Sequence, residues 1–182
     1  DVAKKSSSAL PSFRYASGRL HEGSRTVLLG DSIHTVKPYF GLGANTALED
    51  VQILDKILER TSNLSGAVEE FTKQRANDSR ALVNISRGID RPGKLGTLQF
   101  ILPLILDSIF HKRFPLIFGP SIFGMFQKQN ITFTGIQRRK RLDRMMQSIV
   151  IGSVLSAVAV AMRSLIKVMA KALSVRDVVV SR

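Results

Sequence analysis

The sequence of 182 residues contains no cysteine, which excludes disulfide bonds, metal sites with cysteine ligands and a thiol nucleophile. It also lacks a Gly-x-Gly-x-x-Gly turn of the kind that holds a dinucleotide pyrophosphate, so this stretch alone should not bind a dinucleotide tightly. No charged segment followed by a short apolar run stands near its first residue, so no signal peptide is visible. Because the first residue is Asp1, we expect the sequence to be a fragment that continues upstream.

Acidic side chains are scarce in the C-terminal part of the sequence. Residues 112–182 carry 13 basic and 2 acidic side chains, whereas residues 1–111 carry 14 and 12. A basic block beside long apolar runs favours an anionic membrane surface as a partner. No aromatic stacking platform accompanies the basic residues 138–144, so we expect no nucleic-acid partner.

A strand, a loop and a helix are predicted between residues 26 and 60. Residues 26–29 read Thr-Val-Leu-Leu and end at Gly30, which is typical of a buried parallel strand. Apolar residues recur every three or four positions over residues 44–60, which predicts an amphipathic helix. Asp31 directly follows the strand. Open α/β sheets bind ligands at such strand ends, beside a helix N-terminus.

Further helices are predicted downstream. Ser65 is the expected N-cap of a second helix, apolar on one side and charged on the others, that ends at residues 90–93. Residues 95–126 are apolar but contain three prolines, which favours short helical pieces that either form a core or face lipid. Residues 145–162 are eighteen uncharged residues with basic flanks. This segment fits a membrane-spanning helix, an interfacial helix or a buried helix.

An ordered motif lies between residues 30 and 50. Its glycines, its proline and its polar residues are Gly30, Asp31, His34, Pro38, Gly41, Gly43, Asn45, Glu49 and Asp50. This pattern resembles the second FAD-binding motif of the flavin-dependent aromatic hydroxylases, in which Gly-Asp, two small residues and His precede Pro-x-x-Gly-x-Gly-x-Asn. Residues 10–50 look most similar to the kynurenine monooxygenase branch of that family.

The resemblance assigns roles to the residues of the motif. The cofactor-binding residues that it implies are Gly30, Asp31, Pro38, Gly41, Leu42, Gly43, Ala44 and Asn45. A carboxylate such as Asp31 accepts hydrogen bonds from sugar hydroxyls, and here it would contact the ribityl chain of FAD. Gly41 and Gly43 would let backbone N–H groups approach the flavin ring, and Asn45 would cap the helix whose positive end stabilises negative charge on that ring. Taken singly, each residue also fits an ordinary turn or cap, and His34 fits a structural hydrogen bond in the loop.

The resemblance also implies a reaction. NADPH would reduce FAD, the reduced flavin would capture O2, and a flavin hydroperoxide would hydroxylate a small aromatic substrate without a catalytic side chain or a metal. Tyr39, Phe40 and Asn84 are the expected residues of the substrate pocket. Two alternatives stay open: hydroxylation or epoxidation of a lipid-like substrate, and a non-catalytic, basic, membrane-tethered module that retains the motif.

We therefore expect an α/β fragment that is mainly helical. Residues 1–62 would be the C-terminal part of an FAD-binding domain, residues 63–135 a helical cap, and residues 136–182 a basic segment with a membrane-associated helix. The expected membrane contact covers residues 138–171, and the resemblance implies the outer mitochondrial membrane. Such an enzyme fragment would be inactive without its missing N-terminal half.

Overall fold

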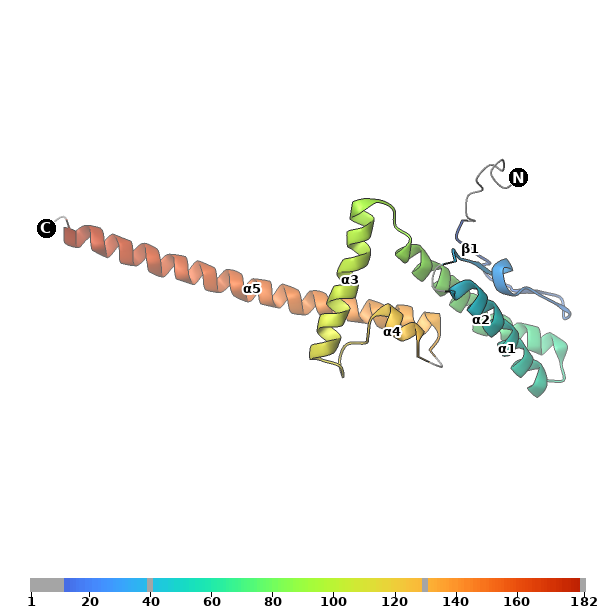
Figure 1. The fold of residues 1–182 in the computed structure, drawn as a ribbon. Coiled ribbons are helices and arrows are strands. Elements are labelled where there is room, and N and C mark those ends of the chain that lie inside the picture. Colours follow the sequence, from blue (N-terminus) through green and yellow to red (C-terminus); the bar gives the residue numbers. More distant parts are fainter. Residues whose placement is uncertain (1–11, 39–40, 129–130, 181–182) are drawn as a thin grey trace, which may run out of the picture. The chain divides into compact units, whose positions relative to one another are not determined.

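The computed structural model describes residues 12–38, 41–128 and 131–180, with side chains as far as Met169. The chain divides into two compact units, residues 1–139 and residues 140–182. Helices make up most of the described residues, and each strand is only two residues long (Figure 1). The expectation of a mainly helical chain is confirmed.

The strands form two short antiparallel pairs in the first unit. They are β1 (Arg14–Tyr15) paired with β4 (His34–Thr35), and β2 (His21–Glu22) paired with β3 (Thr26–Val27). The prediction of a buried parallel strand over residues 26–29 is wrong, since β3 is antiparallel and Leu28 is 42% exposed. The reason is local: Gly23 adopts a φ of 58° in a tight turn, which brings β3 back against β2. Residues 28–29 then lead into the 3-10 helix η2 (Gly30–Ser32).

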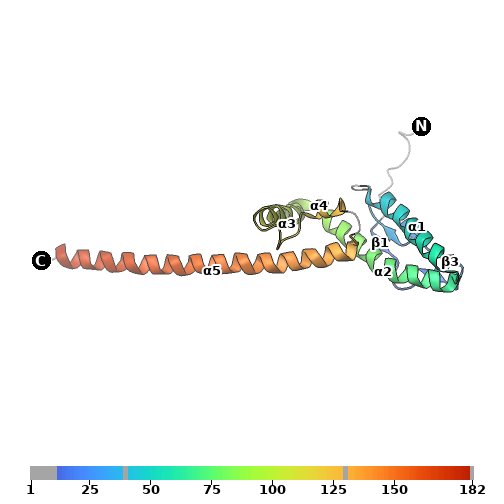
Figure 2. The same ribbon diagram turned by 90° about the horizontal axis from the view of Figure 1, so that it is seen from below.

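Helices α1 (Leu42–Arg60) and α2 (Leu64–Ile89) pack side by side next to these strands (Figures 1 and 2). The predicted helix over residues 44–60 is confirmed, but it begins two residues earlier, after Gly41. A buried cluster joins both helices to the strand region and consists of Leu20, Ile33, Ile57, Ala67 and Phe71. This cluster fixes the loop between η2 and α1 against α2.

The first turn of α2 is capped by Asn63, so the prediction of Ser65 as N-cap is wrong. The Asn63 side chain accepts a hydrogen bond from the Ser65 N–H at 3.1 Å, and the backbone carbonyl of Asn63 accepts from the Ala67 N–H at 3.0 Å. An Asn side chain satisfies a free N–H of the first turn in this way, so the cap lies two residues before the serine and the helix starts at Leu64. The predicted end at residue 90 is confirmed, because Asp90 is the C-cap.

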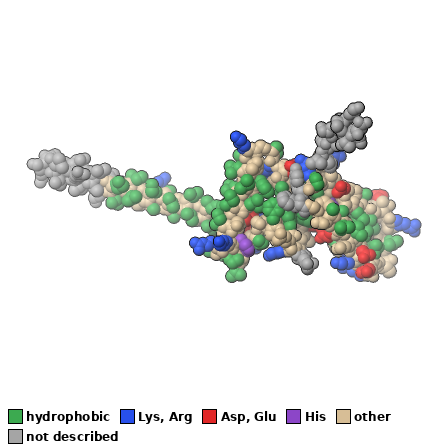
Figure 3. All heavy atoms as spheres, viewed as in Figure 1, with side chains coloured by type: hydrophobic (Ala, Val, Ile, Leu, Met, Phe, Trp, Pro, Cys, Tyr) green, Lys and Arg blue, Asp and Glu red, His purple; other side chains and the backbone are tan. Residues whose placement is uncertain are grey.

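Helix α3 (Gly93–Arg113) is longer than the short pieces that its prolines predicted. It continues through Pro103, since a proline inside a helix removes one backbone hydrogen bond while the turns on both sides remain intact. A bend does follow between α3 and α4 (Ile122–Phe126), as Pro115 and Pro120 predicted. Hydrophobic side chains gather over α3 (Figure 3), and Leu98 and Ile105 are 57% and 50% exposed.

Helix α5 (Phe133–Val180) begins in the first unit and forms the described part of the second. Its first turn packs with the C-terminal half of α2 and with α4, in a cluster around Ile85, Met125 and Ile136. Residues 145–162 are helical throughout, as expected. Both Gly93–Arg113 and Phe133–Met169 are long and apolar enough to cross a membrane, with mean hydropathies of 1.3 and 2.1. In the second helix, none of the residues in the most apolar window is buried.

Candidate functional site

An open groove of about 420 Å³ lies beside the N-terminus of α1. Its lining consists of Asp31, Val36, Pro38, Gly41, Gly43, Ala44 and Ala47. Five of these residues belong to the predicted cofactor site, and they come from η2, from the loop that follows it and from the first turn of α1. The fold therefore brings these five motif residues, which are separated along the sequence, to the surface of one groove.

Glycines at two positions allow the chain to form this groove. Gly41 is the N-cap of α1 with a φ of 66°, a left-handed conformation that side chains disfavour. Gly30 has a φ of 60°, and a Cβ there would lie only 3.2 Å from the Cβ of Ala47. The loop thus approaches α1 more closely than a larger residue at position 30 would permit.

The N-terminus of α1 has no side-chain cap. Gly41 has no side chain, and the Asn45 N–H donates to the Gly41 carbonyl at 3.2 Å as part of the helix itself. The prediction that Asn45 caps α1 is therefore wrong, because Asn45 lies one turn inside the helix and is exposed. The first N–H groups of the helix, at residues 42–44, have no acceptor within the helix, and the positive end of the helix dipole lies at the same place.

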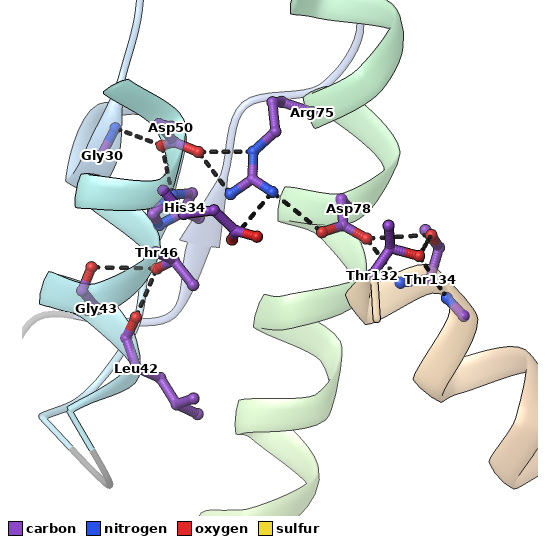
Figure 4. A network of polar contacts seen from close by, with 12 residues as sticks. Gly30, His34, Leu42, Gly43, Thr46, Asp50, Arg75, Asp78, Thr132 and Thr134 are labelled. Atoms are coloured by element: carbon purple, nitrogen blue, oxygen red, sulfur yellow. Dashed lines mark hydrogen bonds and ion pairs between the residues drawn. The ribbon is translucent and has the colours of Figure 1, made fainter. Parts of the chain in front are cut away.

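Behind the groove, a buried carboxylate holds the loop in place. Asp50 Oδ2 accepts from the Gly30 N–H at 2.9 Å and from His34 Nε2 at 2.8 Å (Figure 4). Asp50 Oδ1 accepts from Arg75 Nε at 2.7 Å and pairs with Nη2 at 2.5 Å. The side chains of Asp50 and His34 are fully buried, and that of Arg75 is 3% exposed. The predicted structural role of His34 agrees with this arrangement.

The network continues from Arg75 to the start of α5. Arg75 Nη1 lies 3.2 Å from Asp78 Oδ2 and 3.3 Å from Glu49 Oε2. Asp78 Oδ1 accepts from the Thr134 N–H at 2.8 Å and from the Thr134 hydroxyl at 3.1 Å. Figure 4 shows these side chains in one line between α1, α2 and α5. An uninterrupted series of polar contacts thus connects η2 with the first turn of α5.

The electrostatics of this network favour an ionised Asp50. Burial alone would raise the pKa of Asp50, but the hydrogen bond from His34, the charge of Arg75 and the Gly30 N–H together hold the pKa below its ordinary value of 3.8. An ionised carboxylate only accepts hydrogen bonds, so His34 donates from Nε2. Its Nδ1 is buried and has no hydrogen-bond partner among the described residues.

Comparisons with known proteins agree with the motif. Residues 2–84 match the family described as FAD binding domain. A kynurenine 3-monooxygenase from Mycosarcoma maydis is 27% identical over 143 residues, which cover 78% of this chain and 23% of that protein. Enzymes of the same name from Xanthomonas campestris pv. campestris (strain B100) and from Sus scrofa are 34% and 28% identical, over 56% and 75% of this chain and 23% and 28% of their own.

These matches support an FAD-dependent hydroxylase, with the similarity to an FAD binding domain lying in residues 2–84. The chain is similar to kynurenine 3-monooxygenases, and it spans about a quarter of the length of the curated relatives it matches. In the following, residues 30–38 are called the flavin loop, after the motif that they contain.

The structure separates the expected site residues of this chain into groups. Asp31, Pro38, Gly41, Gly43 and Ala44 line the groove, whereas Leu42 is buried below it. Gly30 belongs to the network behind the groove rather than to its lining.

Of the residues expected at the substrate pocket, only Asn84 is described, and it is not among the lining residues of the groove. Tyr39 and Phe40 lie outside the described residues, and Asn84 is half-buried on α2, away from the groove lining. Sequence reasoning missed Val36 and Ala47 in the lining. It also missed Arg75 and Asp78 in the network, although both stand on the apolar side of α2 at the spacing of Phe71 and Leu82.

Proposed function

We propose that this chain supplies the part of an FAD site that contacts the ribityl chain and the pyrimidine edge of the flavin, within an FAD- and NADPH-dependent monooxygenase. One observation carries the proposal: five motif residues line one groove beside an uncapped helix N-terminus. The groove fits the flavin, because small residues allow close approach of a flat ring, N–H groups face its acceptor edge and a carboxylate lies nearby. When bound, FAD supplies the redox and oxygen chemistry.

The chain's own residues bind and orient the cofactor in this proposal. Asp31 accepts hydrogen bonds from ribityl hydroxyls, and the N–H groups of Gly43 and Ala44 donate to the pyrimidine edge. The positive end of the α1 dipole stabilises negative charge at that edge. Val36 and Ala47 form an apolar wall that keeps water from one side of the ring.

The proposed substrate and the use of O2 follow from the name of the relatives, and the proposed reductant follows from the family resemblance of the motif. Their name gives kynurenine as the substrate, so we propose a small aromatic amino acid of this kind, together with O2 and with NADPH as the reductant. Tyr39, Phe40 and Asn84 remain the proposed substrate contacts. The expected product carries one additional hydroxyl group on the aromatic ring.

The cofactor proposal is tested with the full-length protein that contains this chain. Asp31→Ala removes the carboxylate from the groove, and Asp55→Ala removes an equally exposed carboxylate from α1. Loss of a hydrogen bond to a charged group amounts to about 1.5–3 kcal/mol, so Asp31→Ala should weaken FAD binding by roughly tenfold or more. Quenching of flavin fluorescence gives the dissociation constants. Equal affinities for both variants contradict the assignment of Asp31, and a protein without flavin supports the non-catalytic module.

We also propose that α5 attaches the protein to a membrane through residues 138–171. Apart from the buried Gln147 and the half-buried Ile151, the uncharged residues 145–162 are exposed, and basic residues flank them on both sides, as anionic headgroups would require. Val154→Lys together with Val158→Lys places two charges on exposed helix positions, which leaves folding unchanged. Sedimentation with vesicles containing anionic lipid should fall strongly for this double variant. Unchanged sedimentation rules out residues 145–162 as the anchor.

A second candidate function concerns the substrate. A cavity of about 520 Å³ with largely apolar walls lies between α3 and α4, and it includes Leu104, Phe123 and Lys112. This cavity favours an amphipathic, lipid-like substrate, which would still be hydroxylated or epoxidised with FAD. Product analysis by mass spectrometry with kynurenine and with a fatty acid separates the two candidates, since only the true substrate gains one oxygen atom.

A further inference from the structure

We propose that Arg75, which does not line the groove, is a positioning residue that fixes the flavin loop through Asp50 and connects this loop to the first turn of α5 through Asp78. The inference rests on the proposed function for its consequence on FAD, but its structural part concerns only residues of this chain. The sequence motif stops at Asp50, so Arg75 lies outside it by 25 residues.

The first step is the dependence of the flavin loop on Asp50. A single oxygen of Asp50, Oδ2, accepts from the N–H of Gly30 and from the ring of His34. Gly30 directly precedes Asp31, and His34 follows Gly30 by four residues. These two bonds hold both ends of the turn that presents the Asp31 carboxylate to the groove. A rotation of the Asp50 side chain would therefore release this turn.

The second step is the dependence of Asp50 on Arg75. Two donors of the guanidinium group bind the other oxygen of Asp50, which leaves the carboxylate no freedom to rotate. The planar guanidinium of Arg75 reaches Asp78 with its remaining nitrogen at the same time. A lysine ammonium is a compact point charge without this fork, so it cannot reproduce the arrangement.

The third step is the role of Asp78 at α5. Thr134 is the second residue of α5, and its N–H is one of those that have no acceptor within the helix. Asp78 accepts from this N–H, and therefore caps α5 from within α2. Arg75 thus joins the loop that would hold the cofactor to the beginning of the helix that would reach the membrane.

The alternative is that the Arg75–Asp50 ion pair only stabilises the fold and does not position the flavin loop. The pH dependence of FAD affinity distinguishes these two roles. The titratable and charged groups that face this centre are His34 from β4, Arg75 and Asp78 from α2, and Glu49 beside Asp50 on α1. Without Arg75 the burial penalty on the Asp50 carboxylate loses its main opposing charge, so Asp50 takes up a proton at a higher pH. A protonated Asp50 has lost its charge, so it accepts the two bonds from the flavin loop more weakly.

The experiment measures FAD affinity of the full-length protein between about pH 5 and pH 8. The variants are Arg75→Met, Arg75→Lys and Asp50→Asn, with Arg80→Met as the control because Arg80 is an exposed arginine on the same helix. We expect a flat profile for the wild type and the control. Arg75→Met should bind at least tenfold more weakly and lose further affinity as the pH falls, whereas Asp50→Asn should be weak at every pH, since it has nothing to titrate.

Hydrogen exchange of the peptide that covers residues 30–38 provides a readout that does not need the cofactor. Faster exchange in Arg75→Met than in Arg80→Met is expected, because the Gly30 N–H loses its fixed acceptor. If Arg75→Met does not fold, Arg75→Lys and Asp78→Asn carry the same test with smaller changes. Wild-type exchange and a wild-type pH profile in the folded variants overturn the positioning role. Faster exchange in a protein that never binds FAD instead overturns the proposed function and leaves the positioning role in place.

Discussion

Helices α2 and α3 follow each other in the chain, but they distribute polar and apolar side chains in opposite ways. In α2, Arg75 and Asp78 are buried among apolar residues. In α3, Asp107 is buried as well, but large apolar side chains such as Leu98 and Ile105 are exposed, and its exposed charges are basic. A buried charge needs partners in fixed positions, whereas an exposed apolar surface needs a partner outside the described structure. The comparison agrees with the proposed positioning role of α2, and it makes contact with lipid a testable expectation for α3.

The strongest test of this comparison removes Asp50, the carboxylate that pairs with the buried Arg75 of α2. Asp50→Ala leaves Arg75 and His34 buried without their common acceptor, and removal of one partner of a buried ion pair lowers the free energy of unfolding by about 3–5 kcal/mol. Urea unfolding of the full-length protein measures this loss. Asp55→Ala, on the exposed side of the same helix, is the control with little expected change. A loss as small as that of the control would show that the α2 network contributes no stability.

Acidification gives a smaller effect of the same origin. The pKa of Asp50 is lower in the folded protein than its ordinary value of 3.8, so the unfolded chain takes up the proton first when the pH falls. The stability due to Asp50 is complete above that ordinary value and is lost as the pH drops toward the lower folded pKa. Asp50→Asn removes this dependence. The difference in unfolding free energy between wild type and Asp50→Asn should therefore shrink below about pH 4, and a difference that stays constant would contradict the lowered pKa.

Much of the fold was predictable from the sequence, because helices leave a periodic signal. The stripe of apolar residues over residues 44–60 predicted α1, and the uncharged residues 145–162 predicted a helical segment of α5. The start of α1 was missed by two residues, since Gly41 begins the helix through a left-handed φ that apolar periodicity does not report. The strand predicted over residues 26–29 is present only at residues 26–27, and its parallel pairing was predicted wrongly, because the pairing depends on the turn at Gly23 and on which strand lies beside it.

The groove was predictable and the network behind it was not. The groove residues form a continuous motif whose glycines, proline and carboxylate have defined local roles. Arg75 and Asp78 share the spacing of Val68, Phe71 and Leu82, which placed them on the buried side of α2. A charge at such a position was interpreted as surface, because its burial becomes favourable only with a partner, and Asp50 lies on another helix.

The exposed side of α3 is tested by a charge that lipid would reject. Ile105→Glu changes a half-exposed side chain, so the free energy of unfolding should change by no more than about 0.5 kcal/mol. Insertion of an isoleucine side chain into the interface contributes about 1.5–3 kcal/mol, so the partition coefficient onto anionic vesicles should fall by roughly tenfold. Thr97→Glu, also exposed on α3, is the matched control for added charge. An equal loss of binding for both variants would indicate electrostatic repulsion instead of a lost apolar contact.

The smallest expected change in stability concerns the N-terminus of α2. There, Ala67 and Phe71 pack in one buried cluster with Ile33 of the flavin loop. Asn63→Ala removes the side chain that accepts from the Ser65 N–H, and loss of an N-cap lowers the unfolding free energy by about 1 kcal/mol. Ser65→Ala changes a residue whose backbone, and not its side chain, takes part in that bond, so its effect should lie within about 0.5 kcal/mol. Thermal unfolding of the two variants compares them directly. Because Ala67 and Phe71 follow within two turns and belong to the buried cluster, a loosened first turn should also speed hydrogen exchange there. A larger loss for Ser65→Ala would place the cap at Ser65 and shift the start of α2 by two residues.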